Sequence, residues 1–455
     1  AAQLKTLYAT AATEITGLGN EAITLSDTTI AASDIAAVDA LTTGAVSAAT
    51  VTTITGTNTE VLAAYSLNTA TTTTGLADEA ITVSDAVTVA QANALNALTT
   101  GAVTATISEG DMATLAGLTE TGHAYTVTVT DTTVAAAALN TLDGKTTVNV
   151  DVTAATTLTG TLAALTTAYG AATITGLGAE AVTISDGTIT VGEINTFAAL
   201  TTGVVTATIA TGTIAQLDVI SETGNALSFT VNDGTVDAAT LNNLRAKTTG
   251  VVTVSGNIIN GTASDVAAIY NAQTAGTVAG LANETVTISD TGTVLVADLN
   301  AIDAITSVAI DATAVTGLSG TATAINTAYA SAGITGLANE AVTITGAATS
   351  ADITTANTNT TGLVTVNSTA ITGTYAQLVT LYAANGTTVS GLGDEAITTT
   401  DASLTVAQAN ALDALTTGAV TATISSNDID TLAALTGTGN AYTISVTDTS
   451  VSAEN

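Results

Sequence analysis

Short runs in which apolar and polar side chains alternate recur along the chain. Residues 125–131 read YTVTVTD, so that Tyr125, Val127 and Val129 alternate with threonines and an aspartate. Alternation with a period of two is typical of a strand that buries one face. We therefore expect the first set to point into a core and Thr126, Thr128 and Thr130 to face outward.

A second pattern places an apolar residue at every third position. In residues 88–98 these are Val89, Ala92, Leu95 and Leu98. The spacing predicts a short α- or 3₁₀-helix that lays one face on the strands. Several such runs begin with capping boxes and are followed by glycines that we interpret as helix stops. The capping boxes are Thr88 with Gln91, Thr190 with Glu193 and Thr405 with Gln408, and the glycines are Gly101, Gly203 and Gly418.

The two patterns belong to a repeat. Residues 88–108 and 405–425 differ at one position, and the block Gly-Leu-x-x-Glu-(Ala/Thr)-(Ile/Val)-Thr occurs six times. The blocks start at Gly17, Gly75, Gly176, Gly280, Gly336 and Gly391. Division by the pattern of strand, turn, helix and Thr-Thr-Gly gives coils of 23 to 30 residues, for example 75–101, 102–124, 125–147 and 148–175.

One strand and one short helix per coil predict an α/β solenoid of the leucine-rich-repeat type, with one long parallel sheet. A pure β-solenoid is the alternative, because Thr and Val favour strands and many helix candidates have only eight to ten residues. We expect one continuous array over residues 1–455: a partial coil at 1–16, about sixteen coils at 17–441, and a partial coil at 442–455. The open coils suggest a piece of a longer array, or completion by neighbouring chains.

Composition narrows the function. Aromatic residues make up 2% of the chain and Trp, Cys and Pro are absent, so the core must be built from small side chains without disulfides. No apolar run approaches the roughly 18 residues of a membrane-spanning helix. The net charge of −34 would repel nucleic acid and anionic lipid, which excludes both as partners.

The sequence contains no recognisable set of catalytic residues. The only histidine, His123, lies in TGHAY, and the duplicated module has Asn440 in its place, so we interpret it as a turn residue. No zinc spacing, phosphate-binding glycine loop or cluster of unlike reactive residues occurs. We expect a protein that is not an enzyme.

The best candidates for a site are the glutamates of the six blocks. Glu21, Glu79, Glu180, Glu284, Glu340 and Glu395 recur, and five are followed six residues later by Asp27, Asp85, Asp186, Asp290 or Asp401. Carboxylates repeated at one coil position could bind Ca²⁺, and we name Glu79, Asp85, Asp78, Glu395, Asp394 and Asp401 as metal candidates. The alternative is that each glutamate accepts backbone hydrogen bonds or faces solvent.

Two other recurring features have alternative interpretations. A tyrosine precedes each block, at Tyr8, Tyr65, Tyr169, Tyr270, Tyr329 and Tyr382. A row of tyrosines could bind sugars or a partner, or it could fill the wider coils. The outward threonines could order water as in ice-binding solenoids, or they could simply suit a solvent-facing strand.

The segments TVAQANALDALTTGAVTATIS and LTGTGNAYTISVTDTSVSA resemble the Thr/Ala-rich repeats of very large secreted surface proteins, described as hemolysin-like or adhesin-like, of marine cyanobacteria and some proteobacteria. The resemblance implies export and a role at the cell surface, although the calcium nonapeptide frequent in that group is absent. We therefore predict a structural rod or filament, such as an extracellular filament, surface layer or adhesin stalk, that associates end to end or laterally. A module that binds calcium, glycan or ice along one face is the alternative.

Overall fold

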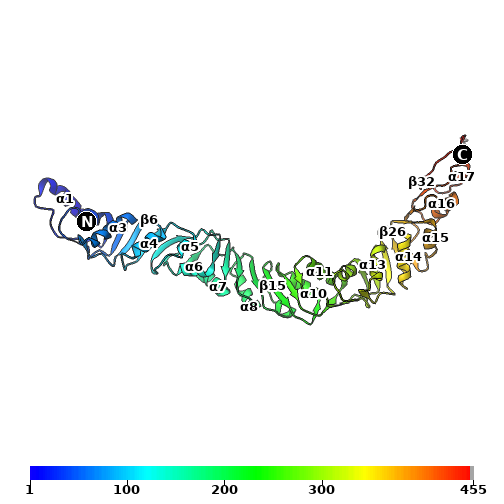
Figure 1. Ribbon diagram of the computed structural model, residues 1–455, viewed down its shortest axis with the longest axis horizontal. Coiled ribbons are helices and arrows are strands. Elements are labelled where there is room, and N and C mark those ends of the chain that lie inside the picture. The colour runs from blue at the N-terminus through cyan, green and yellow to red at the C-terminus, as the bar shows by residue number, and fades with distance from the viewer. Residues whose placement is uncertain (451–455) are drawn as a thin grey trace. The chain divides into compact units, whose positions relative to one another are not determined.

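The protein has an α/β fold in which parallel strands alternate with short helices (Figure 1). The computed structural model describes residues 1–450, and of residues 11–14 the backbone only. The end of the expected partial coil at 442–455 therefore lies outside the described residues. The chain forms two compact units, Ala1–Ala210 with Ile220–Leu227, and Thr211–Val219 with Ser228–Asn455.

The first unit contains short helices and short strands in alternation. Its helices are α1 (Ala2–Glu14), α2 (Ala32–Asp39), α3 (Asn58–Thr69), α4 (Val89–Asn96), α5 (Met112–Leu115), α6 (Ala136–Asp143), α7 (Leu162–Gly170) and α8 (Val191–Ala198). Its strands are β1 (Ile23–Thr24), β2 (Thr29–Ala31), β3 (Val46–Ser47), β4 (Thr53–Gly56), β5 (Thr73–Thr74), β6 (Ala80–Val87), β7 (Val103–Ile107), β8 (Ala124–Thr128), β9 (Thr133–Ala135), β10 (Val150–Asp151), β11 (Thr157–Gly160), β12 (Ile174–Thr175), β13 (Ala181–Ile184) and β14 (Val205–Thr208).

The second unit continues the same alternation. Its helices are α9 (Ile214–Leu217), α10 (Ala238–Arg245), α11 (Ala263–Thr274), α12 (Val296–Asp303), α13 (Ala322–Ala330), α14 (Ser350–Asn359), α15 (Tyr375–Ala383), α16 (Val406–Asp413) and α17 (Ile429–Leu432). Its strands are β15 (Ala226–Val231, with its first two residues in the first unit), β16 (Thr235–Asp237), β17 (Val252–Val254), β18 (Ile258–Gly261), β19 (Val278–Ala279), β20 (Thr285–Ile288), β21 (Thr293–Leu295), β22 (Ile310–Asp311), β23 (Gly317–Gly320), β24 (Ile334–Thr335), β25 (Ala341–Thr345), β26 (Ala348–Thr349), β27 (Val364–Asn367), β28 (Ala370–Gly373), β29 (Val389–Ser390), β30 (Ala396–Thr399), β31 (Val420–Thr423) and β32 (Ala441–Thr443).

Parallel pairing in register builds the core of each unit. In the first unit Ile54 pairs with Ile81, and Ile81 with Val103. In the second unit Leu318, Val342, Val364 and Val389 form one continuous row across β23, β25, β27 and β29. The side chains of both rows are fully buried. Each coil therefore covers the apolar face of the next, as the alternation at residues 125–131 predicts, where Tyr125, Val127 and Val129 are also buried.

The strands form several sheets where the sequence predicted one long sheet. In the first unit β1, β3 and β5 form one sheet, and β2, β4, β6, β7, β8, β10 and β12 form another. The reason is that many coils carry two short strands separated by a turn, such as β10 and β11. Each of these coils contributes to two sheets, so one sheet begins along the chain before the previous sheet ends.

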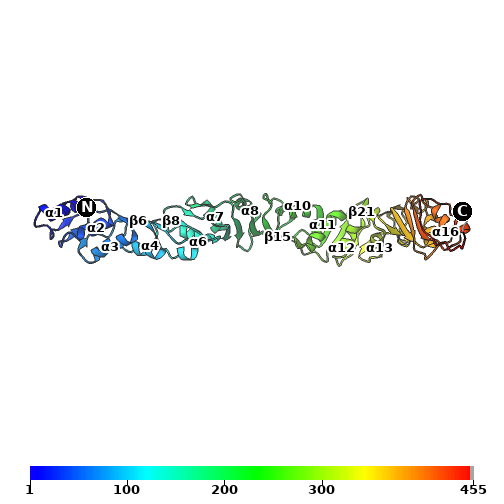
Figure 2. The same cartoon turned by 90° about the horizontal axis from the view of Figure 1, so that it is seen from above.

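The helices begin as the sequence predicts and end differently. The capping boxes of α4, α8 and α16 are present, with Val89, Ala92 and Leu95 buried in α4. The interpretation of the glycines as helix stops is wrong, because α4 ends at Asn96 with Ala97 as its C-cap, several residues before Gly101. Neighbouring helices such as α11, α12 and α13 contact one another in sequence order (Figure 2).

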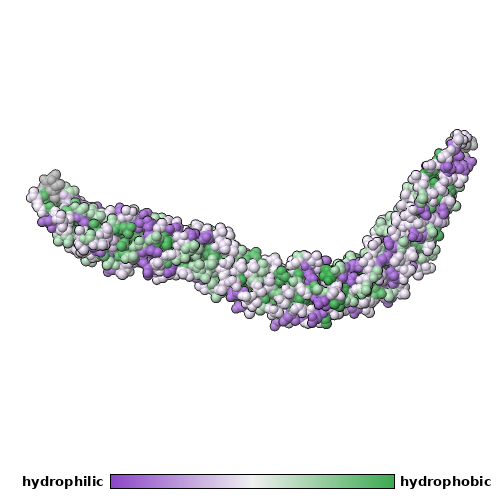
Figure 3. Space-filling view, in the orientation of Figure 1, coloured by the Kyte–Doolittle hydropathy of each residue, from purple (hydrophilic) through white to green (hydrophobic). Residues whose placement is uncertain are grey.

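The surface mixes hydrophobic and hydrophilic residues. On the face drawn in Figure 3, hydrophobic and hydrophilic residues lie side by side in small areas within each unit. Within residues 1–450, no helix combines the length and apolar character needed to cross a membrane.

Candidate functional site

Each glutamate of the six blocks accepts a hydrogen bond from a tyrosine hydroxyl. Tyr65 donates to Glu79 at 2.8 Å and Tyr382 donates to Glu395 at 2.7 Å. The other pairs are Tyr8 with Glu21 at 2.9 Å, Tyr169 with Glu180 at 3.0 Å, Tyr270 with Glu284 at 3.4 Å and Tyr329 with Glu340 at 3.0 Å. The tyrosine comes from the helix before the block, so each pair fastens that helix to the turn that follows it.

The same carboxylates also accept a backbone N–H from two residues earlier. Glu79 binds the N–H of Ala77 at 3.0 Å, and Glu395 binds the N–H of Gly393 at 3.0 Å. Five of the six glutamates are buried, with Glu79 and Glu340 at 0% exposure, and Glu21 is half-buried. A buried carboxylate needs such partners because it has lost its water. The expectation that these glutamates accept backbone hydrogen bonds is confirmed, whereas the expectation that they face solvent is wrong for the five that are buried.

The Thr-Thr-Gly segment at the end of each coil holds the backbone of the glutamate at its start. The Thr99 hydroxyl donates to the carbonyl oxygen of Glu79 at 2.6 Å and accepts the N–H of Gly101 at 2.9 Å. A Cβ on Gly101 would collide with that same carbonyl oxygen. Glycine is therefore required here for close approach between the end of the coil and its start. The same arrangement recurs at Thr42 with Gly44, Thr360 with Gly362 and Thr416 with Gly418.

The electrostatics of the pairs keep the proton on the tyrosine. Burial, followed by the neighbouring Glu180, raises the pKa of Tyr169 to about 12, although the Thr201 hydroxyl opposes this shift. Burial is also the largest cause that raises the pKa of Tyr65 and Tyr382, with the partner glutamate second. At Glu21 the backbone N–H of Gly19 is the main cause that lowers the pKa of the carboxyl group. A tyrosine whose pKa is raised in this way is not suited to exchange protons near neutral pH.

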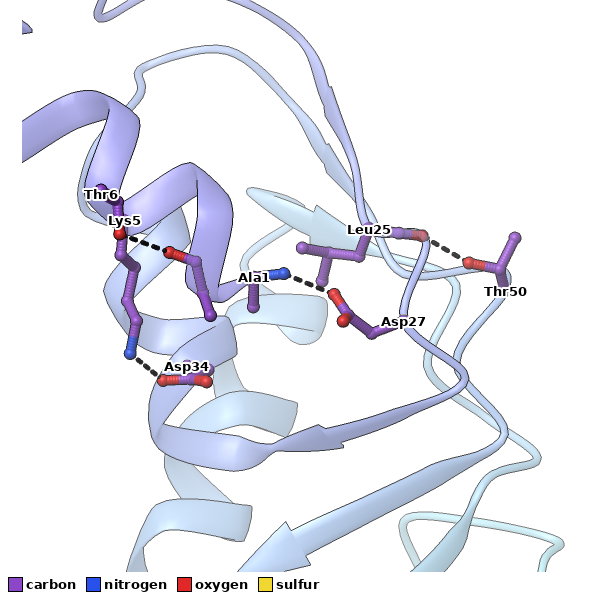
Figure 4. Close-up of polar contacts among 8 residues, drawn as sticks. Ala1, Lys5, Thr6, Leu25, Asp27, Asp34 and Thr50 are labelled. Carbon is purple, nitrogen blue, oxygen red and sulfur yellow. Dashed lines mark hydrogen bonds and ion pairs between the residues drawn. The ribbon is translucent and has the colours of Figure 1, made fainter.

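The aspartates that follow the glutamates lie at the start of helices in the preceding coil. Asp401 accepts the N–H of Tyr375, the first residue of α15, at 2.6 Å, and Asp85 accepts the N–H of Asn58, the first residue of α3, at 2.8 Å. Asp186 and Asp290 do the same for Leu162 and Ala263. In Figure 4, Asp27 receives the terminal ammonium group of Ala1 beside α1. These carboxylates complement the positive end of a helix dipole.

Four further acidic residues have this role and were not identified from the sequence. Glu109 accepts the first N–H of α4, Asp131 that of α5, Asp233 that of α9 and Asp448 that of α17. Asp131 and Asp233 directly follow an alternating run, in TVTD and TVND, and this position is the signal that could have revealed them. The effect of such a contact is seen at Asp401, where the hydrogen bond from the N–H of Tyr375 is the main cause that lowers the pKa of the carboxyl group.

The metal candidates are not gathered at one point. Glu79 faces Tyr65, Asp85 faces the start of α3, and Asp78 is exposed. Glu395, Asp401 and Asp394 repeat this arrangement in the second unit. Among the described residues, no group of three or more His, Cys, Asp or Glu side chains could hold a metal ion. The glutamates and the later aspartates are engaged in protein hydrogen bonds, and calcium binding by the six residues stays a prediction.

His123 lies where the repeat requires a hydrogen-bond acceptor. Its Nδ1 accepts the N–H of Val103 at 3.0 Å in a buried position. The amide oxygens of Asn225 and Asn440 accept the equivalent N–H of Val205 and Val420 at 2.8 and 2.7 Å. Burial lowers the pKa of His123, which favours the neutral ring that an acceptor nitrogen requires. The imidazole thus replaces an amide in a turn, as we expected from Asn440.

A row of asparagines on the helices was also missed. Asn93 donates to the carbonyl oxygen of Gly117 in the next coil at 2.8 Å and accepts the N–H of Thr119 at 3.2 Å. Asparagine recurs at the fifth position of the helices, and its side chain bonds the coil that follows. In the other members the side-chain amide of the asparagine donates to a backbone carbonyl oxygen of the next coil: Asn140 to Ala164, Asn242 to Asp265, Asn300 to Ala324, Asn326 to Asp352, and Asn410 to Ala434.

Comparison with known proteins adds no assignment. The chain matches no protein-family model and no curated protein. The function must therefore be inferred from the arrangement of the residues themselves.

Proposed function

We propose that this chain is a non-enzymatic structural repeat protein, a tract of an extracellular rod or filament at a bacterial cell surface. Its coils would form one α/β solenoid of the leucine-rich-repeat type, with the pure β-solenoid as the alternative. The resemblance to giant secreted repeat proteins supports the extracellular location and the role as a filament, surface layer or adhesin stalk.

One observation carries the proposal: the polar residues that recur in the repeat bond neighbouring segments of the array. The Thr-Thr-Gly threonines, the helix asparagines and the acidic residues at helix starts all contact the neighbouring turn of the chain, about 19 to 27 residues away, as with Thr99, Asn93 and Asp85. The Tyr–Glu pairs fasten each helix to the next turn. A chain in which recurring residues join coils gains length when coils are added, and it needs no unique site.

The proposal predicts a defined length per coil. Parallel strands lie about 4.8 Å apart, so about sixteen coils would extend roughly 75–80 Å. Strand edges at the ends of such an array offer unpaired backbone groups to another copy. We therefore expect elongated particles that associate end to end or laterally.

The duplicated segments provide a direct test. Because residues 88–108 and 405–425 are nearly identical, residues 1–101 can be joined to residues 419–455 without a new junction sequence. This variant lacks 317 residues, or about twelve coils. At about 4.8 Å per coil, its longest dimension should fall by roughly 60 Å while the circular dichroism per residue is retained. Small-angle scattering measures the length, and electron microscopy shows whether chains join.

The control is a second variant in which residue 101 is joined to residue 424, so that five more residues are lost and the register of the strand is broken. It should not fold. Compact particles of the full chain at every concentration, or a shortened variant that does not fold, would contradict the proposal.

A further inference from the structure

An open pocket in the second unit is lined by two short segments that are close in space. One is the end of β27 with the turn after it, residues 366–369, and the other is the loop that follows β29, residues 391–394; the pocket has a volume of about 670 Å³. Both segments belong to consecutive coils, and Val364 of β27 pairs with Val389 of β29. The position of the pocket is therefore fixed by the sheet.

Oxygen atoms dominate the polar lining. The Asp394 side chain is exposed at the rim. Ser368 is 6% exposed and its hydroxyl has no hydrogen-bond partner, although it lines the pocket. The carbonyl oxygen of Val366 faces Gly391, at 2.5 Å from where a Cβ on that glycine would lie. A buried hydroxyl without a partner is costly, so it points to a missing ligand.

The pocket lining offers few hydrogen-bond donors and no positively charged side chain to an anion. The backbone N–H of Gly393 is directed at Glu395, at 3.0 Å, and its donor capacity is thus used inside the protein. No Lys, Arg or His is among the residues that line the pocket. The net charge of −34 also concentrates cations at the surface.

The turn differs among the modules. In the Gly280 module the carbonyl oxygen of Val254 makes a similar approach, at 2.2 Å from the Cβ position of Gly280, but the loop has Asn283 where the Gly391 block has Asp394. In two further modules a threonine lies against the glycine. Thr153 approaches Gly176 and Thr313 approaches Gly336, each within 3 Å of the position of a glycine Cβ. Those turns are folded by an aspartate, because the Oδ1 atom of Asp311 accepts both the N–H and the hydroxyl of Thr313, at 3.0 and 2.6 Å. The turn at 366–369 has no such aspartate, and the space stays open.

The Gly75 block differs from the Gly391 block at one of its eight positions. It has Asp78 where the Gly391 block has Asp394. In that module the backbone of Ala49 lies 2.8 to 3.0 Å from the Cβ position of Gly75, and the Thr50 hydroxyl donates to the carbonyl oxygen of Leu25 (Figure 4). Asp78 therefore serves as an internal control for Asp394.

We propose that this pocket binds a hard divalent cation of the Ca²⁺ type. The Asp394 carboxylate, the Ser368 hydroxyl and the Val366 carbonyl oxygen are its protein ligands, and water completes the coordination. An all-oxygen set of mixed charge in an irregular, open space suits Ca²⁺, whereas Mg²⁺ demands a small octahedron and Zn²⁺ prefers nitrogen and sulfur. With one carboxylate the dissociation constant is about 10⁻⁴ to 10⁻³ M. Of the metal candidates predicted from the sequence, Asp394 is thus the one that this site retains.

The test is calorimetric titration of the purified chain with CaCl₂ at about 0.15 M salt, which screens diffuse attraction to the acidic surface. The full chain should bind with a dissociation constant of about 0.1 to 1 mM. Asp394→Asn should weaken binding by at least about tenfold, Ser368→Ala by roughly threefold, and Asp78→Asn should change it less than twofold. MgCl₂ should bind at least about tenfold more weakly than CaCl₂.

Each of the following outcomes would overturn a part of the proposal. No saturable heat up to about 10 mM CaCl₂ removes the site, as does equal weakening by Asp78→Asn and Asp394→Asn, which would show diffuse binding to acidic residues. Unchanged affinity in Ser368→Ala removes the hydroxyl from the ligand set. Circular dichroism of each variant confirms that it is folded. The site does not depend on the proposed structural function, so either can fail alone.

Discussion

The Tyr–Glu pairs make a quantitative prediction at Tyr382. Replacement of Tyr382 by Phe keeps the ring and removes only the hydroxyl that donates to Glu395 at 2.7 Å. Glu395 is 1% exposed, so water cannot easily replace the lost donor. Loss of a hydrogen bond to a charged group costs about 1.5–3 kcal/mol. The free energy that opposes local opening around Glu395 should fall by that amount.

Amide hydrogen exchange measures this local free energy. The N–H of Gly393 donates to the same carboxylate at 3.0 Å and reports on the loop. Because about 1.4 kcal/mol corresponds to a factor of ten, its exchange rate should rise by roughly 10- to 150-fold in Tyr382→Phe. Burial is the main cause that raises the pKa of Tyr382, so the wild-type hydroxyl keeps its proton throughout a measurement near neutral pH.

Two other tyrosines serve as controls. Tyr375 begins the same helix, and its hydroxyl makes no hydrogen bond within the described residues, so Tyr375→Phe should leave exchange at Gly393 unchanged. Tyr8→Phe should have a smaller effect on its own loop than Tyr382→Phe has, because Glu21 is half-buried and water can replace the hydroxyl. A double-mutant cycle with Glu395→Gln isolates the pair. Unchanged exchange in Tyr382→Phe, or zero coupling in the cycle, would refute the assignment of the pair as a stabilising contact.

Three further predictions test the other contacts between coils. Gly101→Ala should destabilise the fold by about 1–3 kcal/mol in urea denaturation, because the new Cβ meets the carbonyl oxygen of Glu79. Gly192→Ala is the control: this glycine lies in α8 with open space around it, so the change should be neutral or stabilise the fold by up to about 1 kcal/mol. His123→Asn should retain the melting temperature within a few degrees, since an amide fills the equivalent places, whereas His123→Ala should lower it because a buried N–H loses its acceptor, with a cost of about 1–3 kcal/mol. The pKa of Asp401 is lowered in the folded protein, so its contribution to the free energy of unfolding is present above its unfolded pKa of about 3.9 and is lost as pH falls through the folded value. Asp401→Asn should therefore lower stability at pH 7 and make acid denaturation of that region less steep, as followed by circular dichroism.

The sequence predicted the elements well because these depend on local patterns. The buried set Tyr125, Val127 and Val129 and the capping box of Thr88 with Gln91 follow from residues within a few positions of each other. The Tyr–Glu pairs join residues 11 to 14 positions apart across a turn, and no periodicity within one element reveals them. Both residue types were identified as recurring, but their mutual contact required the structure.

Two roles were not predicted for the same physical reason, which is that they depend on contacts between successive turns of the chain. Gly101 was assigned to the end of a helix, whereas its lack of a side chain is needed by the carbonyl oxygen of Glu79, 22 residues earlier at the start of the same coil. Asp85 was named with Glu79 as a metal candidate, and its hydrogen bond to the first N–H of α3, 27 residues earlier, was not predicted. Neither distance along the chain is marked by a local pattern, and coils of variable length hide the register.

The surplus of acidic residues follows in part from the architecture. In a stack of parallel strands that are each followed by a helix, the helix N-termini within one unit lie on the same side, and their partial positive charges accumulate there. The chain has four Lys and Arg residues against 38 Asp and Glu residues, so it could not balance negative ends with cations, but it can balance positive ends with carboxylates. Asp85, Asp186, Asp290 and Asp401 do this from the following coil. A copied coil therefore brings the carboxylate that its predecessor requires, and the array can lengthen without leaving a helix start uncompensated.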